Sequence, residues 1–122
     1  KGTDDGVLAR QEIASMMPVA LLDIAPSHAV LDMCASPGSK TTQALEAIYS
    51  RHGNEDDGNE RAWPSGFVVA NELDAERSYV LAKRCASLRS ASGSCMITCH
   101  RAQIFPGAAA DTSRIFDRII CD

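Results

Sequence analysis

One stretch of the sequence decides the fold: Val30-Leu31-Asp32-Met33-Cys34-Ala35-Ser36-Pro37-Gly38-Ser39-Lys40-Thr41-Thr42-Gln43. It begins with apolar residues, continues through a turn of small residues, and leads directly into a segment with apolar residues at helical spacing. Glycine in such a turn permits a backbone conformation that other residues resist, and the exposed amides at a helix start attract anionic groups. The stretch therefore predicts a strand, an anion-binding turn and a helix.

Four apolar runs of strand length lie along the chain, at residues 29–34, 66–71, 95–99 and 118–121. They are continuous rather than alternating, as expected for a parallel sheet that helices cover on both faces. Residues 41–51 and 74–90 have apolar residues at helical spacing and are predicted to be crossover helices. The predicted fold class is therefore α/β with a parallel sheet, which is partial because open doubly wound sheets have more than four strands.

End signals define the second crossover helix. Asp74 is the predicted N-cap, Glu76 lies in the first turn, Arg89 lies near the end and Gly93 just beyond it.

Two other segments have less regular patterns of apolar residues. Residues 7–24 are mostly apolar around Pro18, and predict two short helices or one kinked helix that packs as a lid on a sheet edge. Residues 102–116 have only a weak helical pattern and are predicted to be a loop.

Composition limits the class of protein. The chain has 122 residues, 45% of them hydrophobic, which is enough for one small domain with a core. A net charge of -4 argues against a domain that binds nucleic acid unaided. No apolar run approaches the about 18 residues that a membrane helix needs, so we expect a soluble, intracellular protein without a membrane partner. The five cysteines are expected to be free thiols.

Residues 52–65 are polar, acidic and rich in glycine, and predict an exposed insertion. A metal-binding loop is a weaker interpretation, because the carboxylates lack the spacing of a calcium loop. Cys95 and Cys99 are also poor metal ligands, because on a strand they lie about 13 Å apart. We expect no metal.

Polar residues end all four predicted strands: Asp32, Asn71-Glu72, His100-Arg101 and Asp122. The carboxyl ends of parallel strands form one edge, where open α/β folds bind ligands. The turn after the first strand excludes two ligand classes. A Walker loop needs glycine at Cys34 and Ser39, and a dinucleotide-binding turn needs three glycines. S-adenosylmethionine remains, with Glu72 placed to accept both ribose hydroxyls, and Asp122 either near the reacting groups or simply at a strand end.

The quoted stretch resembles the S-adenosylmethionine loop of the Sun-domain family, the RNA cytosine-5 methyltransferases. Three further segments are similar to that family, in its eukaryotic tRNA-modifying branch: Gln11 to Pro18, Ala102-Gln103 with Phe105-Pro106, and Ile119 to Asp122. The resemblance implies a Rossmann-like methyltransferase fold, with this chain as the N-terminal, cofactor-binding part of the catalytic domain. It also implies a nuclear or nucleolar location.

The resemblance implies a set of site residues. Those holding S-adenosylmethionine are Cys34, Ala35, Ser36, Pro37, Gly38, Ser39, Lys40, Glu72 and Asp122. Lys40 is also expected to reach the target base. Relatives have an acidic residue contacting adenine where this sequence has Arg101, which departs from the pattern.

The family chemistry uses a cysteine that adds to carbon 6 of cytosine and a second cysteine that helps to release the product. Both belong to motifs beyond Asp122, so we expect no catalytic residue in this chain and RNA contacts, with tRNA, through other regions. Cys34 belongs to the cofactor turn and Cys121 to a strand, so neither is expected to be the nucleophile. The basic residues of the second crossover helix are expected to be solvated charges rather than an RNA-binding groove: Arg77, Lys83, Arg84 and Arg89.

Two alternatives to an RNA methyltransferase remain. One is a non-catalytic scaffold for RNA or protein, which Arg101 favours, and the other is a small-molecule methyltransferase.

Overall fold

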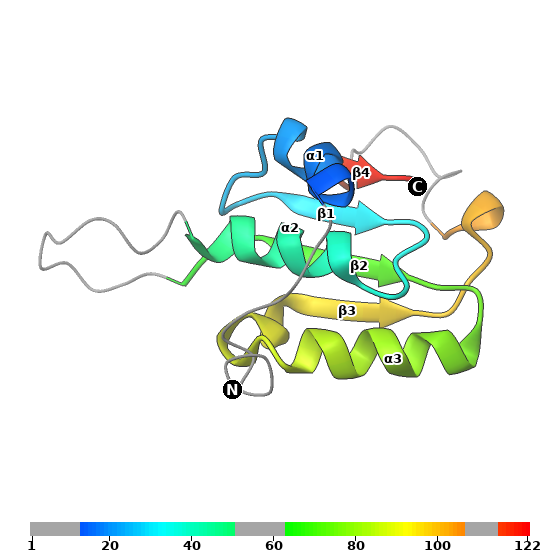
Figure 1. Ribbon diagram of the computed structural model, residues 1–122. Coiled ribbons are helices and arrows are strands. Elements are labelled where there is room, and N and C mark those ends of the chain that lie inside the picture. Colours follow the sequence, from blue (N-terminus) through cyan, green and yellow to red (C-terminus); the bar gives the residue numbers. More distant parts are fainter. Residues whose placement is uncertain (1–12, 51–62, 107–114) are drawn as a thin grey trace, which may run out of the picture.

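The computed structural model describes residues 13–50, 63–106 and 115–122. Its centre is a four-stranded parallel sheet with the order β3-β2-β1-β4 (Figure 1). The strands are β1 (Ala29–Asp32), β2 (Phe67–Asn71), β3 (Cys95–Thr98) and β4 (Arg118–Ile120). Each lies within a predicted run: β2 ends with its run, at Asn71, and the other three strands end one or two residues before theirs. The α/β class and the parallel sheet are thus confirmed.

Two helices connect the first three strands. Helix α2 (Ser39–Ser50) links β1 to β2, and α3 (Ala75–Ala86) leads from β2 toward β3. Figure 1 shows α2 lying across β1 and β2, with α3 alongside β3. Leu45, Ile48 and Leu81 are fully buried between these helices and the sheet, against Val30 and Val68. Burial of one face of each helix explains the helical spacing in the sequence.

Helix α1 (Ile13–Leu21) contains Pro18 and lies beside α2 and near β4 (Figure 1). Gln43 Nε2 donates to Met16 O at 2.9 Å, and Arg118 Nε donates to Leu22 O at 2.6 Å. These two bonds attach the α1 region to α2 and to the edge strand. The described residues form one helix here, with Pro18 inside it, and residues 7–12 of the predicted segment lie outside the described residues.

The end of α3 differs from the prediction. The helix begins as expected, because Asp74 Oδ1 accepts from Arg77 N at 2.9 Å, but it ends at Ala86 rather than at Ser90. Ser87 Oγ donates to Arg84 O at 2.6 Å and occupies a carbonyl at the end of the helix. A 3-10 helix, η1 (Arg89–Ser94), follows, so Gly93 lies inside that segment and does not cap α3.

Two other predicted segments are described in part. A short 3-10 helix, η2 (Ala102–Ile104), begins the segment predicted to be a loop, and residues 107–114 lie outside the described residues. Of the predicted insertion, residues 52–62 also lie outside them. Trp63 is 74% exposed beside it. Within the described ranges, no helix has the length and apolar character needed to cross a membrane.

Gly66 is required where β2 begins. Its amide donates to Pro26 O at 2.8 Å, and a Cβ there would lie 2.6 Å from that oxygen and 2.7 Å from His28 O. Such distances are too short for a side chain carbon, so glycine permits the turn before β1 to approach β2 closely. This approach aligns the starts of the two central strands, and with them the strand ends that form the site.

Candidate cofactor-binding site

The turn between β1 and α2 is held at both ends. Thr41 Oγ1 donates to Asp32 Oδ2 at 2.7 Å, which links the end of the strand to the first turn of the helix. Between them, Ala35 N donates to Asn71 O of the neighbouring strand at 2.8 Å. Gly38 has φ +102°, and a Cβ at this position would lie 2.9 Å from Leu81 Cδ1 of α3. The turn thus has one conformation that depends on glycine.

Asp32 is 2% exposed, and burial raises the pKa of its carboxyl above the ordinary 3.8. The hydrogen bond from Thr41, the backbone amide of Cys34 and the charge of Lys40 act in the opposite direction but do not cancel this effect. The hydrogen bonds that Asp32 accepts come from Thr41 and from the backbone of Cys34, which both belong to the turn region. Asp32 therefore has a structural role in the turn, and it also lines the smaller cavity described below.

Asn71 connects three strand ends and was not predicted to do so. Its Nδ2 donates to Met33 O at 3.0 Å and to His100 O at 2.8 Å, while its Oδ1 accepts from Thr98 Oγ1 at 3.0 Å. The residue is 1% exposed. A carboxamide suits this place because it both donates and accepts. The sequence feature that could have predicted this role is an asparagine at the end of a continuous apolar strand.

Glu72 follows Asn71 and its side chain is 5% exposed. Its Oε1 accepts from Asp74 N at 3.0 Å and lies 3.7 Å from Arg77 Nη1. No hydrogen bond within the described part of the chain uses Oε2. Because Glu72 lines the cavity described next and a carboxylate oxygen accepts hydrogen bonds, this side chain is suited to a ligand with hydroxyl donors.

Among the described residues, the turn borders two cavities. The larger, of about 520 Å³, is lined from β1, β2, α3 and the segment after β3 by Met33, Cys34, Ser36, Asn71, Glu72, Leu73, Asp74, Arg77, His100, Ala102, Gln103 and Asp122. The smaller, of about 310 Å³, is lined by Ser15, Asp32, Cys34, Ala35, Ser36, Pro37, Ser39, Lys40 and Asp122. Three residues line both cavities: Cys34, Ser36 and Asp122. The turn therefore lies between the two cavities and forms part of the wall of each.

The predicted site residues divide between these cavities. Glu72 lines only the larger one, and Ala35, Pro37, Ser39 and Lys40 line only the smaller one. Gly38 lines neither, because it packs against Leu81. The sheet edge therefore brings together eight of the nine predicted residues, and the ninth shapes the turn that carries them.

Lys40 and Asp122 form an ion pair of 2.5 Å across the smaller cavity. The Lys40 side chain is 15% exposed and comes from the first turn of α2. This pair places a cation and an anion next to the amides at the start of that helix. A zwitterionic amino acid group matches such an arrangement of charges.

Arg77 was expected to be a solvated charge, and its side chain is 59% exposed, but it also contacts the turn and Glu72. Its Nη2 donates to Ser36 O at 3.1 Å, and Ser36 Oγ donates to Arg77 O at 3.2 Å. The α3 N-terminus begins beside the turn, so the first-turn arginine reaches both the turn and Glu72. The sequence position of Arg77 did not predict these contacts, because Ser36 and Arg77 are 41 residues apart in the chain.

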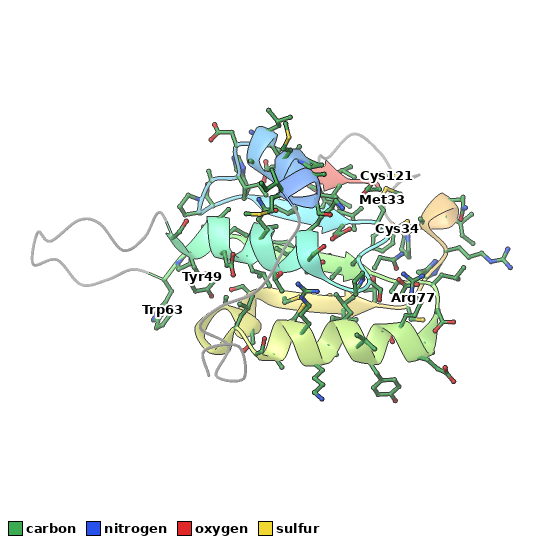
Figure 2. All side chains as sticks on the ribbon, viewed as in Figure 1. Met33, Cys34, Tyr49, Trp63, Arg77 and Cys121 are labelled. Carbon is green, nitrogen blue, oxygen red and sulfur yellow. The ribbon has the colours of Figure 1, made fainter. Side chains whose placement is uncertain are left out.

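Two cysteines lie at the same edge (Figure 2). Cys34 and Cys121 are exposed and free. Partial desolvation of the thiol, followed by the nearby Cys121, Asp32 and Glu72, raises the pKa of Cys34 above the ordinary 9.0. A thiol must ionise to act as a nucleophile, so Cys34 is not activated in this environment. Within the described residues, no group of three or more His, Cys, Asp or Glu side chains is placed to hold a metal ion.

Arg101 is exposed and does not line the larger cavity, whereas His100, Ala102 and Gln103 do. The 3-10 turn at Ala102–Ile104 brings the residues on either side of Arg101 to the wall. The residue at this position therefore has no contact with the cavity, and the carboxamide of Gln103 provides the polar groups there.

The same fold occurs in a solved structure of another protein. The crystal structure of NSun6 from Pyrococcus horikoshii with SFG has a TM-score of 0.64 and 18% sequence identity to this chain, and the match covers 82% of this chain and 22% of that one. Together with the parallel sheet, this similarity shows the class of fold: an α/β fold with a parallel sheet that this chain shares with that structure.

Two curated relatives identify the protein family within this class of fold. The multisite-specific tRNA:(cytosine-C(5))-methyltransferase of Saccharomyces cerevisiae is 44% identical over 124 residues, which cover 96% of this chain and 16% of the relative. The tRNA (cytosine(34)-C(5))-methyltransferase of Drosophila melanogaster is 39% identical over 126 residues, covering 98% and 16%. No family model matches the chain. The chain belongs to the RNA cytosine-C5 methyltransferase family and spans about a sixth of the length of these relatives.

Proposed function

We propose that this chain is the cofactor-binding part of an enzyme that methylates carbon 5 of cytosine in RNA, with S-adenosylmethionine as methyl donor and tRNA as substrate. Residues 1–122 form the N-terminal part of the catalytic domain. The enzyme acts in the nucleus or nucleolus. The names of both curated relatives, which act on tRNA cytosine, support the choice of substrate.

One observation carries the cofactor assignment: the buried carboxylate of Glu72 borders a cavity of about 520 Å³ that also contains the turn after β1. This volume lies within the about 300–1,000 Å³ typical of small-molecule sites. Glu72 Oε1 is already bonded within the protein, and Oε2 is not. A ribose with two adjacent hydroxyl donors fits this acceptor, so the residues present fit an adenosine group.

The smaller cavity suits the amino acid end of the same molecule. We assign it to the methionine group, whose carboxylate would lie near the amides at the start of α2 and near Lys40, and whose ammonium would lie near Asp122. Cys34 and Ser36 border both cavities and lie between the two ends of the ligand. All nine predicted residues thus keep a role, Gly38 by shaping the turn.

When bound, the cofactor supplies the methyl group. The attacking cysteine and the second cysteine are assigned to regions outside this chain, as are the RNA contacts. The raised pKa of Cys34 supports this assignment, since a protonated thiol does not add to cytosine. The net charge of -4 supports RNA binding by other regions.

The test is calorimetric titration of the full-length protein with S-adenosylhomocysteine, followed by bisulfite sequencing of tRNA from cells with and without the gene. We expect binding, and loss of specific methylated cytosines without the gene. Absence of binding by a folded protein would contradict the cofactor site and favour the scaffold. Binding with unchanged RNA methylation would favour a methyltransferase for small molecules.

A further inference from the structure

We infer that Arg77 is a positioning residue that aligns the Glu72 carboxylate with the turn after β1 and so sets the preference of the site for an unmodified ribose. This inference rests on the proposed function. The relevant side chains come from three elements that meet only in the folded protein: the turn, the residue after β2, and the first turn of α3.

Reciprocal hydrogen bonds attach Arg77 to the turn. The guanidinium donates from Nη2 to Ser36 O at 3.1 Å, and Ser36 Oγ donates to Arg77 O at 3.2 Å. The position of the guanidinium is therefore set from both its head group and its backbone. Figure 2 shows Arg77 at the same edge of the sheet as Cys34.

The other side of the guanidinium faces Glu72. Arg77 Nη1 lies 3.7 Å from Glu72 Oε1, which also accepts from Asp74 N at 3.0 Å. These two contacts hold one carboxylate oxygen and leave Oε2 without a hydrogen bond from the described residues. The rotation of the carboxylate is thus determined by Arg77 and the backbone together.

Glu72 is much more buried than Arg77, which suits an acceptor inside the cavity that is held by a cation at the rim. The Glu72 side chain is 5% exposed, whereas that of Arg77 is 59% exposed. The arginine supplies a compensating charge from the rim of the cavity, and its contact with Glu72 is to Oε1 rather than to Oε2. An ionised carboxylate accepts hydrogen bonds only, so a correctly oriented Glu72 favours a ligand with both ribose hydroxyls.

The test compares S-adenosylhomocysteine with its 2′-deoxy analogue by calorimetry on the full-length protein. The wild type is expected to prefer the ribose form by about tenfold or more. Arg77→Gln is expected to reduce this preference to about threefold or less, because the carboxylate is no longer held. Lys83→Gln removes the same charge from an exposed position on the same helix, and is expected to keep the wild-type preference. A folded Arg77→Gln variant with the wild-type preference would overturn the inference.

A double-mutant cycle separates positioning from general stability. In a Glu72→Gln background, Arg77→Gln is expected to change the preference by less than about twofold, because the group that it positions has been altered. An undiminished effect in that background would also overturn the inference. If Arg77→Gln does not fold, Arg77→Lys replaces it. A single ammonium cannot hold Ser36 O and Glu72 together, so the preference should fall about threefold, and an unchanged value would count against the role.

The proposed function and this inference fail in different ways. A folded wild-type protein that binds neither ligand contradicts the proposed cofactor site. A wild type that binds both ligands, with a ribose preference that Arg77→Gln leaves intact, contradicts only the role of Arg77.

Discussion

Thr41 donates a 2.7 Å hydrogen bond to the buried carboxylate of Asp32, across the turn that these two residues enclose. The bond joins the last residue of β1 to the first turn of α2, so it closes the turn at its base. Since this turn borders both cavities, the pair determines how the rest of the site is placed.

Thr41→Val tests the importance of this bond. Valine has nearly the same shape but no donor, so a buried oxygen of Asp32 loses its partner. We expect the free energy of unfolding of the full-length protein to fall by about 1–3 kcal/mol in urea denaturation. Ser50→Ala, which removes an exposed hydroxyl with only a local bond, is the control and should change stability by less than about 0.5 kcal/mol. Equal effects of the two substitutions would contradict the assigned role.

Asp32 also predicts a dependence of stability on pH. Because burial raises its pKa in the folded protein above 3.8, the native state binds more protons than the unfolded state between the two pKa values. The Asp32 contribution to stability is thus fully present below the unfolded pKa and is lost as pH rises through the folded one. The unfolding free energy of the wild type minus that of Asp32→Asn should decrease as pH rises from about 4 to 7. A difference that is constant or increases over this range would show that the pKa is not raised.

Gly38→Ala is expected to destabilise the protein by about 1–3 kcal/mol. The residue has φ +102°, and the added carbon would lie 2.9 Å from Leu81 Cδ1. Gly93→Ala is the matched control, because a Cβ there would have no atom within 4 Å. Thermal unfolding measures both variants, and S-adenosylhomocysteine titration should show weaker binding only for Gly38→Ala. Comparable melting temperatures for the two would contradict the packing of the turn against α3.

Gln103 and Arg101 are expected to differ in their effect on cofactor affinity. Gln103 lines the larger cavity and offers a carboxamide that can pair with the polar edge of adenine, whereas Arg101 is exposed outside the wall. In titrations of the full-length protein, Gln103→Ala should weaken S-adenosylhomocysteine binding by about tenfold, and Arg101→Ala should change it by less than about twofold. The reverse order would place adenine against Arg101.

The sequence by itself determined the elements and the kind of site. Continuous apolar runs predicted a parallel sheet, and Asp74 predicted the start of α3, since both signals depend on neighbouring residues and on burial. The small-residue turn and Glu72 were placed at one edge for the same reason, because all parallel strands end on the same side. The Ser87 hydroxyl that ends α3 is also local, but a single serine does not distinguish a capping bond from a solvated side chain.

Only the tertiary structure decided which side chains meet at that edge. The strand order β3-β2-β1-β4 places Asn71 between Met33 and His100, and it places Arg77 against Ser36. The division of the site into two cavities, with Gly38 turned toward Leu81, has the same origin. These are hydrogen bonds and contacts between residues far apart in the chain. They depend on distances of a few ångströms across strands, which spacing along the sequence does not encode.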